Sequence, residues 1–298
     1  MKINLEDYLE SKKKIVDAAL EGCLSGLSSV PTTLVESVRY SVFAGGKRLR
    51  PILCLASAEA VGGDPGAALP AACALEMIHT YSLIHDDLPA MDDDDYRRGK
   101  PTNHKVFGEG LAILAGDALL TEAFHLLSEK ERFKGVPADR VLRVIREIAR
   151  AAGPFGMVGG QVVDIQSEGR TVGEETLYFI HSRKTGALIT ASVRSGAILG
   201  DATEAQTHAL SQYGRDLGLA FQVADDILNV EGSREVLGKE TGSDTRRRKA
   251  TFPAVVGLET SRRKARELAA HAVVHLEDFD GKAEPLRAIA RYMVERKS

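Results

Sequence analysis

Residues Ala, Leu, Glu and Arg recur at offsets of three and four along most of the chain. This spacing gathers apolar side chains on one face of a helix, whereas a half-buried β-strand needs strict alternation. Alternating runs of Val, Ile and Thr are missing, so the sequence predicts an all-α fold. We expect helices near residues 5–24, 33–43, 51–60, 67–87, 108–127, 138–152, 174–199, 204–229, 251–277 and 283–296.

The composition favours one domain spanning 1–298. The chain has 298 residues and 44% hydrophobic content, enough to bury a large core, and no obvious linker divides it. The 39 basic and 42 acidic side chains give a net charge of −3, and the one strongly basic run is at 246–249, so nucleic-acid binding is not predicted.

No signal peptide or uninterrupted stretch of eighteen apolar residues is found, so we expect no membrane insertion. Cys23, Cys54 and Cys73 lack the spacing of a metal site or a disulfide framework, which is typical of reduced thiols. These features predict a cytoplasmic protein.

The densest charge lies at residues 76–101, where six carboxylates fall within ten positions: Asp86, Asp87, Asp92, Asp93, Asp94 and Asp95. Such crowding requires solvent or cations to neutralise it. Pro89 cannot continue a helix, so we expect the helix to end near Asp87 and the loop to fold back towards Asp86. Upstream, Glu76 and His79 share a helix face with Asp86, and a polar stripe on an apolar helix predicts a cavity.

An acidic run alone is typical of a solvated surface, but a second cluster favours a metal site. The segment FQVADDILN at 221–229 places Asp225 and Asn229 one turn apart on another apolar helix, beside Asp226. Two acidic clusters on separate helices predict facing sites for a hard divalent cation. An EF-hand is a poor alternative, because the first run lacks the turn glycine and the final glutamate.

Basic groups follow or precede these clusters. Two glycines come directly before Lys47, Arg48 and Arg50, an arrangement that suits a phosphate group and equally suits an ordinary basic helix entry. Arg97 and Arg98, after the acidic loop, fit either surface salt bridges or a diphosphate held between metals and guanidinium groups.

Three further features are less decisive. Gln161 and Asp164 are polar groups on a glycine-containing apolar stretch, for which helix packing is the expected role. Lys184 and Thr185 interrupt what otherwise looks like one helix. A long polar connection follows the second acidic cluster, and Lys239, Asp244 and Lys249 are its candidate contacts.

The chain resembles the short-chain trans-isoprenyl diphosphate synthases of the farnesyl or geranylgeranyl type. The resemblance spans residues 44–253 and rests on GGKRLRP, HDDLPAMDDDDYRRGKPT, KTG, FQVADDILN and LGKETGSD. It implies an all-α, single-domain helical bundle around a deep central cavity, a homodimer, and Mg²⁺ with a diphosphate at the cavity mouth.

The resemblance also implies roles for individual residues. It makes Asp86, Asp92 and Asp225 the metal ligands and, together with Lys184, the catalytic group. It places isopentenyl diphosphate on Lys47, Arg50, His79 and Arg98. It places the allylic diphosphate on Arg97, Lys184, Thr185, Gln222, Lys239 and Lys249.

The implied reaction joins isopentenyl diphosphate to dimethylallyl or geranyl diphosphate, giving farnesyl diphosphate. Breaking the allylic carbon–oxygen bond leaves a carbocation and a diphosphate, which cations stabilise. The family's second motif usually ends in aspartate, and Asn229 brings no charge to the metal. Alternatives are a geranylgeranyl diphosphate synthase and a catalytically silent partner subunit. A terpene cyclase is disfavoured because it has no use for a second diphosphate site.

Product length is expected to depend on Tyr81 and Ser82, five and four positions before Asp86. They lie roughly 6 to 8 Å down the helix, where a growing prenyl tail would meet the cavity wall. Geometry alone leaves Tyr81 equally compatible with an ordinary core aromatic. The resemblance favours a cavity floor, because an aromatic residue at this position is similar to the bacterial farnesyl pattern. We therefore expect a fifteen-carbon product, with twenty carbons as the alternative.

Overall fold

The computed structural model describes residues 3–26, 29–231 and 251–295, and these residues form an all-α protein, as predicted. The strands of this part are a two-residue antiparallel pair, β1 (Tyr96–Arg97) and β2 (Lys100–Pro101). The helices are α1 (Leu5–Ser25), α2 (Thr32–Val42), α3 (Leu49–Ala60), α4 (Pro65–Asp86), α5 (Asn103–Phe107), α6 (Glu109–Ser128), α7 (Ala138–Ala152), α8 (Met157–Ser167), α9 (Glu174–Ile180), α10 (Ala187–Leu199), α11 (Glu204–Glu231), α14 (Phe252–Val256), α15 (Leu258–Val274) and α16 (Glu284–Glu295).

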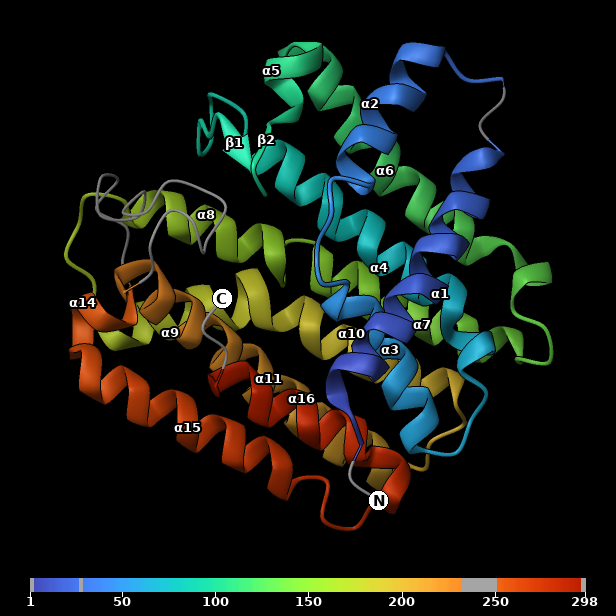
Figure 1. The fold of residues 1–298 in the computed structure, drawn as a ribbon, viewed down its shortest axis with the longest axis vertical. Coiled ribbons are helices and arrows are strands. Elements are labelled where there is room, and N and C mark those ends of the chain that lie inside the picture. Colours follow the sequence, from blue (N-terminus) through green and yellow to red (C-terminus); the bar gives the residue numbers. More distant parts are fainter. Residues whose placement is uncertain (1–2, 27–28, 232–250, 296–298) are drawn as a thin grey trace.

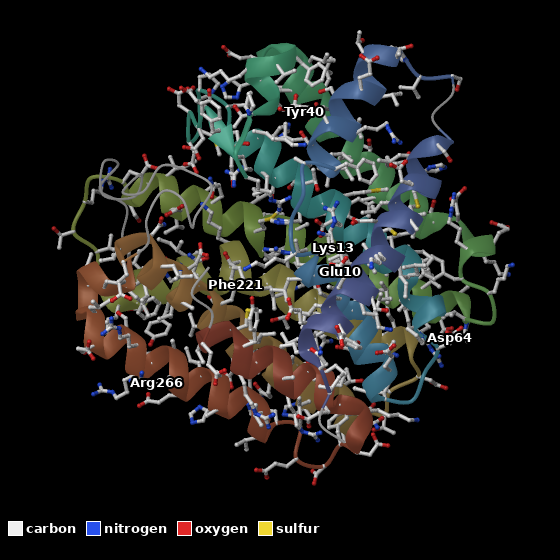
Figure 2. All side chains as sticks on the ribbon, in the orientation of Figure 1. Glu10, Lys13, Tyr40, Asp64, Phe221 and Arg266 are labelled. Carbon is white, nitrogen blue, oxygen red and sulfur yellow. The ribbon has the colours of Figure 1, made fainter. Side chains whose placement is uncertain are left out.

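Helices α3 and α10 join the two halves of the molecule. One core cluster draws on α1, α4, α6 and α7, another on α11, α15 and α16, and both include residues of α3 and α10. In Figure 1, α2 and α5 lie at the top of the view and α15 crosses the bottom, with α10 between them. Side chains fill the spaces between the ribbons, with Phe221 of α11 near the middle and Arg266 of α15 at the rim (Figure 2).

Helix α8 was not among the predicted helices. Its apolar Val158, Val162 and Ile165 are exposed, whereas the polar Asp164 and the small Gly160 are buried. This arrangement inverts the usual amphipathic pattern, in which apolar positions mark the buried face. A pattern search that expects apolar residues inside therefore misses α8.

Two predicted helices are interrupted. The segment expected as one helix at 174–199 contains a π-helical turn, His181–Gly186, between α9 and α10. The segment expected at 251–277 is divided into α14 and α15 by Gly257, whose φ of +85° is left-handed and readily adopted by glycine. Turns of π-helix are rare in proteins, and those that occur are frequently found at functional sites.

Helices α4 and α6 are, by length and composition alone, long and apolar enough to cross a membrane. Within the apolar window, α4 is 67% buried inside the protein, which identifies it as a core helix. The corresponding window of α6 is 39% buried, so much of its apolar surface faces outward.

Candidate active site

The end of α4 and the following loop place two aspartates side by side, as predicted. The helix ends at Asp86 because Pro89 cannot extend it, and Asp87 caps it through a bond from its own N–H to the Leu83 carbonyl. The Asp92 N–H then donates to the Asp86 carbonyl at 2.7 Å. The loop therefore folds back, which brings the backbone of Asp92 against that of Asp86.

Helix α8 supports both the first aspartate and the lysine opposite. Gln161 Nε2 donates to Asp86 Oδ1 at 3.0 Å, and Lys184 Nζ donates to Asp164 Oδ2 at 2.7 Å. The expected helix-packing role of Gln161 and Asp164 is therefore incomplete, because both bind polar groups of the site. Their spacing of three residues, which puts them on one helix face, was the signal available in the sequence.

Lys184 is a permanent cation in this setting. Burial lowers the pKa of Lys184, but the carboxylates of Asp164, Asp86 and Asp92 outweigh burial and leave this pKa raised. The ammonium group thus lies within the electrostatic reach of both aspartates of the first acidic cluster.

Glycines allow the π turn to sit between its neighbours. A Cβ at Gly160 would lie 2.3 Å from the backbone nitrogen of Lys184, and a Cβ at Gly218 would lie 2.7 Å from the Gly186 Cα. Helices α8 and α11 therefore approach the turn more closely than any larger residue would permit. This packing fixes the backbone that carries Lys184 and Thr185.

The second acidic cluster has two distinct members. Asp226 is 3% exposed and accepts hydrogen bonds from the Phe252 N–H at 2.9 Å and from Gln222 Nε2 at 3.0 Å, with His181 Nε2 at 3.1 Å. Asp225 is half-buried. Asp226 therefore has a structural role, because its hydrogen bonds join α11 to neighbouring segments. Asp225 is the more accessible carboxylate of the two.

Gln222 links this cluster to the π turn. Thr185 Oγ1 donates to Gln222 Oε1 at 2.8 Å, while the amide nitrogen of Gln222 serves Asp226. The structure thus connects Thr185 and Gln222, two of the residues expected to bind one diphosphate.

The donor set suits a hard divalent cation. Asp86, Asp92 and Asp225 are half-buried carboxylates, and carboxylate oxygens are the ligands that Mg²⁺ and Ca²⁺ prefer. Within the described part of the chain, no three His, Cys, Asp or Glu side chains are gathered closely enough to hold a metal by themselves. The three carboxylates therefore fit a divalent cation, which would bridge them when bound.

A loop rich in left-handed residues forms the cationic side of the site. Arg98 Nη1 donates to the Gly45 carbonyl, and Gly46 has a φ of +121°. A Cβ at Gly46 would lie 2.6 Å from Arg98 Nη1. The backbone conformation therefore favours glycine, and the guanidinium group packs against it. Lys47, the next residue, is exposed.

Arg50 and His79 lie within electrostatic reach of Arg98. Burial lowers the pKa of Arg50 to about 10, with Arg98 adding to the effect and Glu76 opposing it, so the guanidinium stays charged at neutral pH. Its Nε is buried and has no hydrogen-bond partner among the described residues. Burial and the charges of Arg50 and Arg98 hold the pKa of His79 well below its usual range, so the imidazole is neutral. A buried unpaired donor beside several cations is the signature of an anion site.

Arg97 is tied to the protein by a bidentate ion pair. Its Nε lies 2.7 and 3.0 Å from the two oxygens of Asp87, and its Nη2 lies 2.6 Å from Asp87 Oδ1. Burial raises the pKa of Asp87 to about 6, although Arg97 acts in the opposite direction. A second carboxylate, Asp94, lies 3.7 Å from Arg97. Arg97 is therefore positioned before any substrate binds.

Tyr81 and Ser82 differ in their surroundings. Tyr81 is 8% exposed and packs edge-on against His85, with ring centroids 5.7 Å apart. The Ser82 hydroxyl donates to the His79 carbonyl of its own helix at 2.8 Å. Helix α6 crosses close by, since a Cβ at Gly116 would lie 2.1 Å from His85 Nε2. Tyr81 is thus a buried aromatic residue packed against His85, and its role in product length stays a prediction. Lys239, Asp244 and Lys249 lie outside the described residues.

The comparisons with known proteins agree on the family. Residues 31–288 match the polyprenyl synthetase family model. A geranylgeranyl diphosphate synthase from Cyanophora paradoxa is 50% identical over 99% of this chain and 97% of its own length. A farnesyl diphosphate synthase from Geobacillus stearothermophilus is 47% identical over 99% of this chain and 98% of its own.

A solved structure shows the same arrangement. The crystal structure of an FPP/GFPP synthase from Zymomonas mobilis aligns with a TM-score of 0.86 and 41% identity, covering 99% of this chain and all of that one. The family generally uses divalent metal ions and acts on isoprenyl diphosphates. Because the family model covers most of the chain and its relatives match it almost end to end, the chain belongs to the polyprenyl synthetase family and is a prenyltransferase.

Proposed function

We propose that the protein is a Mg²⁺-dependent farnesyl diphosphate synthase. It would condense isopentenyl diphosphate with dimethylallyl and then geranyl diphosphate, releasing diphosphate at each step. The observation that carries the proposal is the pairing of two unlike charged regions at one end of α4. A cationic region around Arg50 suits one diphosphate, and a carboxylate region around Asp86 suits a metal with a second diphosphate.

The residues divide the work of the reaction. Asp86, Asp92 and Asp225 would hold Mg²⁺, which when bound supplies positive charge to the diphosphate leaving group. Lys184, already charged and fixed by Asp164, would bind the allylic diphosphate and stabilise the charge that develops as the carbon–oxygen bond breaks.

The second substrate provides the nucleophile. Lys47, Arg50, His79 and Arg98 would hold isopentenyl diphosphate so that its double bond faces the allylic carbon. As the new carbon–carbon bond forms, a proton leaves the adjacent carbon, and the departing diphosphate is a sufficient base. A protein nucleophile is not needed. The surrounding apolar helices would exclude water, which would otherwise convert the cation to an alcohol.

Tyr81 supports a fifteen-carbon product. Its ring is buried in α4 about one turn from Asp86 and is braced by His85, so it can block a lengthening tail. Ser82, whose hydroxyl is engaged within its helix, would line the same depth. A twenty-carbon product is the second candidate, favoured by the geranylgeranyl diphosphate synthases among the relatives.

A homodimer is part of the proposal. On α6, Ile113 is 44% and Leu114 is 57% exposed, although this helix is among the most apolar in the protein. A second copy of the chain covering that face would remove these side chains from water.

The proposal also places the protein in the cytoplasm, as a single domain over 1–298. We propose no membrane insertion, because the other long apolar helix, α4, is a core helix.

Product analysis tests the proposal. Purified protein is incubated with isopentenyl diphosphate, dimethylallyl diphosphate and Mg²⁺, and the dephosphorylated products are separated by chromatography. The expected product is farnesol. Geranylgeraniol would select the second candidate, and the absence of any elongated product would instead support a catalytically silent partner subunit.

A further inference from the structure

Arg48 lies between two residues proposed to bind substrate, yet its own side chain points into the protein. Its Nη1 lies 2.7 Å from Glu76 Oε1, its Nε lies 2.8 Å from Asp17 Oδ1, and its Nη2 lies 2.7 Å from the Val42 carbonyl. Arg48 is 3% exposed and Glu76 is 2% exposed. All three guanidinium nitrogens are therefore used inside the protein, which leaves Arg48 unable to bind a substrate.

The backbone of Arg48 is held in an unfavourable conformation. Its φ of 52° and ψ of 35° are left-handed, a region that residues with a Cβ rarely adopt. Such strain persists only where the surrounding contacts over-determine it, and it concentrates at functional sites. Here the three side-chain bonds impose the conformation at the residue where the glycine loop turns into α3.

Glu76 supplies a counter-charge to the same region. It lies on α4, three residues before His79, and its charge raises the pKa of both Arg50 and Arg98 against the effect of burial. The carboxylate therefore stabilises a group of guanidinium ions that would otherwise repel one another when no anion is bound.

We propose that the Arg48–Glu76 ion pair is the positioning element of the isopentenyl diphosphate site. By fixing the turn at Arg48, the pair sets the directions in which Lys47 and Arg50 leave the chain and holds them beside His79. Stability alone does not account for the pair, because apolar side chains of similar volume often replace a buried ion pair without loss. The inference rests on the proposed function, since it assigns a substrate to this side of the site.

A paired substitution separates position from charge and stability. Arg48→Met with Glu76→Met removes one positive and one negative charge, so the local net charge is unchanged. Arg98 loses the attraction of Glu76 together with the repulsion of Arg48, and Asp17, which also loses Arg48, keeps a partly exposed carboxylate that water can solvate. We expect the KM for isopentenyl diphosphate to rise about tenfold or more, the effect of one mispositioned charge-assisted hydrogen bond. The KM for the allylic substrate and kcat should stay within about twofold, because Lys184 and the aspartates are untouched.

The control is an arginine–glutamate pair on α10 and α7, whose residues are not among the proposed substrate contacts. Arg194 Nε lies 2.8 Å from Glu147 Oε2, and Arg194 Nη2 lies 2.9 Å from Glu147 Oε1. Arg194→Met with Glu147→Met should leave both KM values at the wild-type level. A conservative variant, Arg48→Lys, keeps the charge but not the three directed bonds, so a rise of about threefold in KM for isopentenyl diphosphate is expected.

The outcomes are distinguishable. Wild-type protein that elongates no substrate would remove the proposed function itself. Active wild type with an unchanged KM for isopentenyl diphosphate in the paired variant, or with equal rises in both KM values, would overturn the positioning role. If the paired variant does not fold, Arg48→Lys decides the question, and wild-type kinetics in that variant would overturn the inference.

Discussion

The cationic and carboxylate regions at the end of α4 differ in how complete they are. Around Arg50, a buried ion pair with Glu76 fixes Arg48 at the turn between Lys47 and Arg50. Around Asp86, the supporting bonds come from Gln161 and Asp164, and the described residues offer no ready-made metal cluster.

This difference would let the protein treat the two proposed diphosphates differently. The cationic region already has its charges, a neutral imidazole and a buried unpaired donor in place, so an anion can bind with little rearrangement. The carboxylate region repels a diphosphate until a cation neutralises it. The region that needs a cation is the one where the carbon–oxygen bond is proposed to break.

The largest expected effect comes from removing a proposed metal ligand. Asp86→Ala, Asp92→Ala or Asp225→Ala should each lower kcat by about 10³-fold, because charge stabilisation of the leaving group is lost. Circular dichroism should show an intact fold. Asn229→Ala is the matched control and should cost far less, since an amide brings no charge. Wild-type turnover by chelator-stripped protein without added metal would contradict the metal-dependent account.

A smaller and more selective effect should separate the two regions. Lys184→Ala should chiefly raise the KM for the allylic substrate, whereas Arg50→Ala or Lys47→Ala should chiefly raise the KM for isopentenyl diphosphate. Each loses a charge-assisted hydrogen bond worth about 1.5 to 3 kcal/mol. Steady-state kinetics with each substrate varied in turn would measure the split, and identical changes in both KM values would refute the assignment.

Tyr81→Ala tests the proposed role of this residue in product length. Removal of the ring opens space about one turn from Asp86, so the product should lengthen beyond fifteen carbons while the rate of the first condensation changes little. Chromatography of the dephosphorylated products provides the measurement. If the variant stops at the same carbon number as the wild type, another residue sets product length.

The smallest effect is expected for His79→Gln. The pKa of His79 lies well below 6.5, the ordinary value for histidine. The imidazole is therefore neutral at pH 6.5 and above, and it gains a proton only when the pH falls well below 6.5. A neutral amide can donate a similar hydrogen bond, so KM for isopentenyl diphosphate should change less than about threefold. The variant and wild type should also share one pH profile from about pH 6.5 to about 8.5. A wild-type inflection in that range that is absent from the variant would contradict the neutral assignment.

Much of the first acidic cluster followed from the sequence because its signals are local. Pro89 ends the helix, and the loop then folds back from Asp92 to Asp86 as predicted. The all-α fold followed from periodicity for the same reason, since each helix is encoded within its own segment.

Features that depend on contacts between distant segments could not be predicted. Helix α8 was missed because its polar face points inward to Asp86 and Lys184, against the usual apolar rule. Around the start of α3, the sequence presents Lys47, Arg48 and Arg50 alike, and only the left-handed backbone at Arg48 turns its side chain inward. The structural use of Asp226 likewise depends on a partner 26 residues away, the Phe252 N–H.

The central claim is that the cationic region is complete without metal and the carboxylate region is not. Calorimetric titration of the wild-type protein tests this claim, in Mg²⁺ and in chelator. One ligand is isopentenyl diphosphate, and the other is an unreactive thio analogue of dimethylallyl diphosphate, in which sulfur replaces the bridging oxygen and the allylic bond does not break. We predict that chelator weakens binding of isopentenyl diphosphate less than about threefold and weakens binding of the allylic analogue about 100-fold or more, equivalent to about 2.7 kcal/mol. Equal metal dependence of the two ligands would contradict the account.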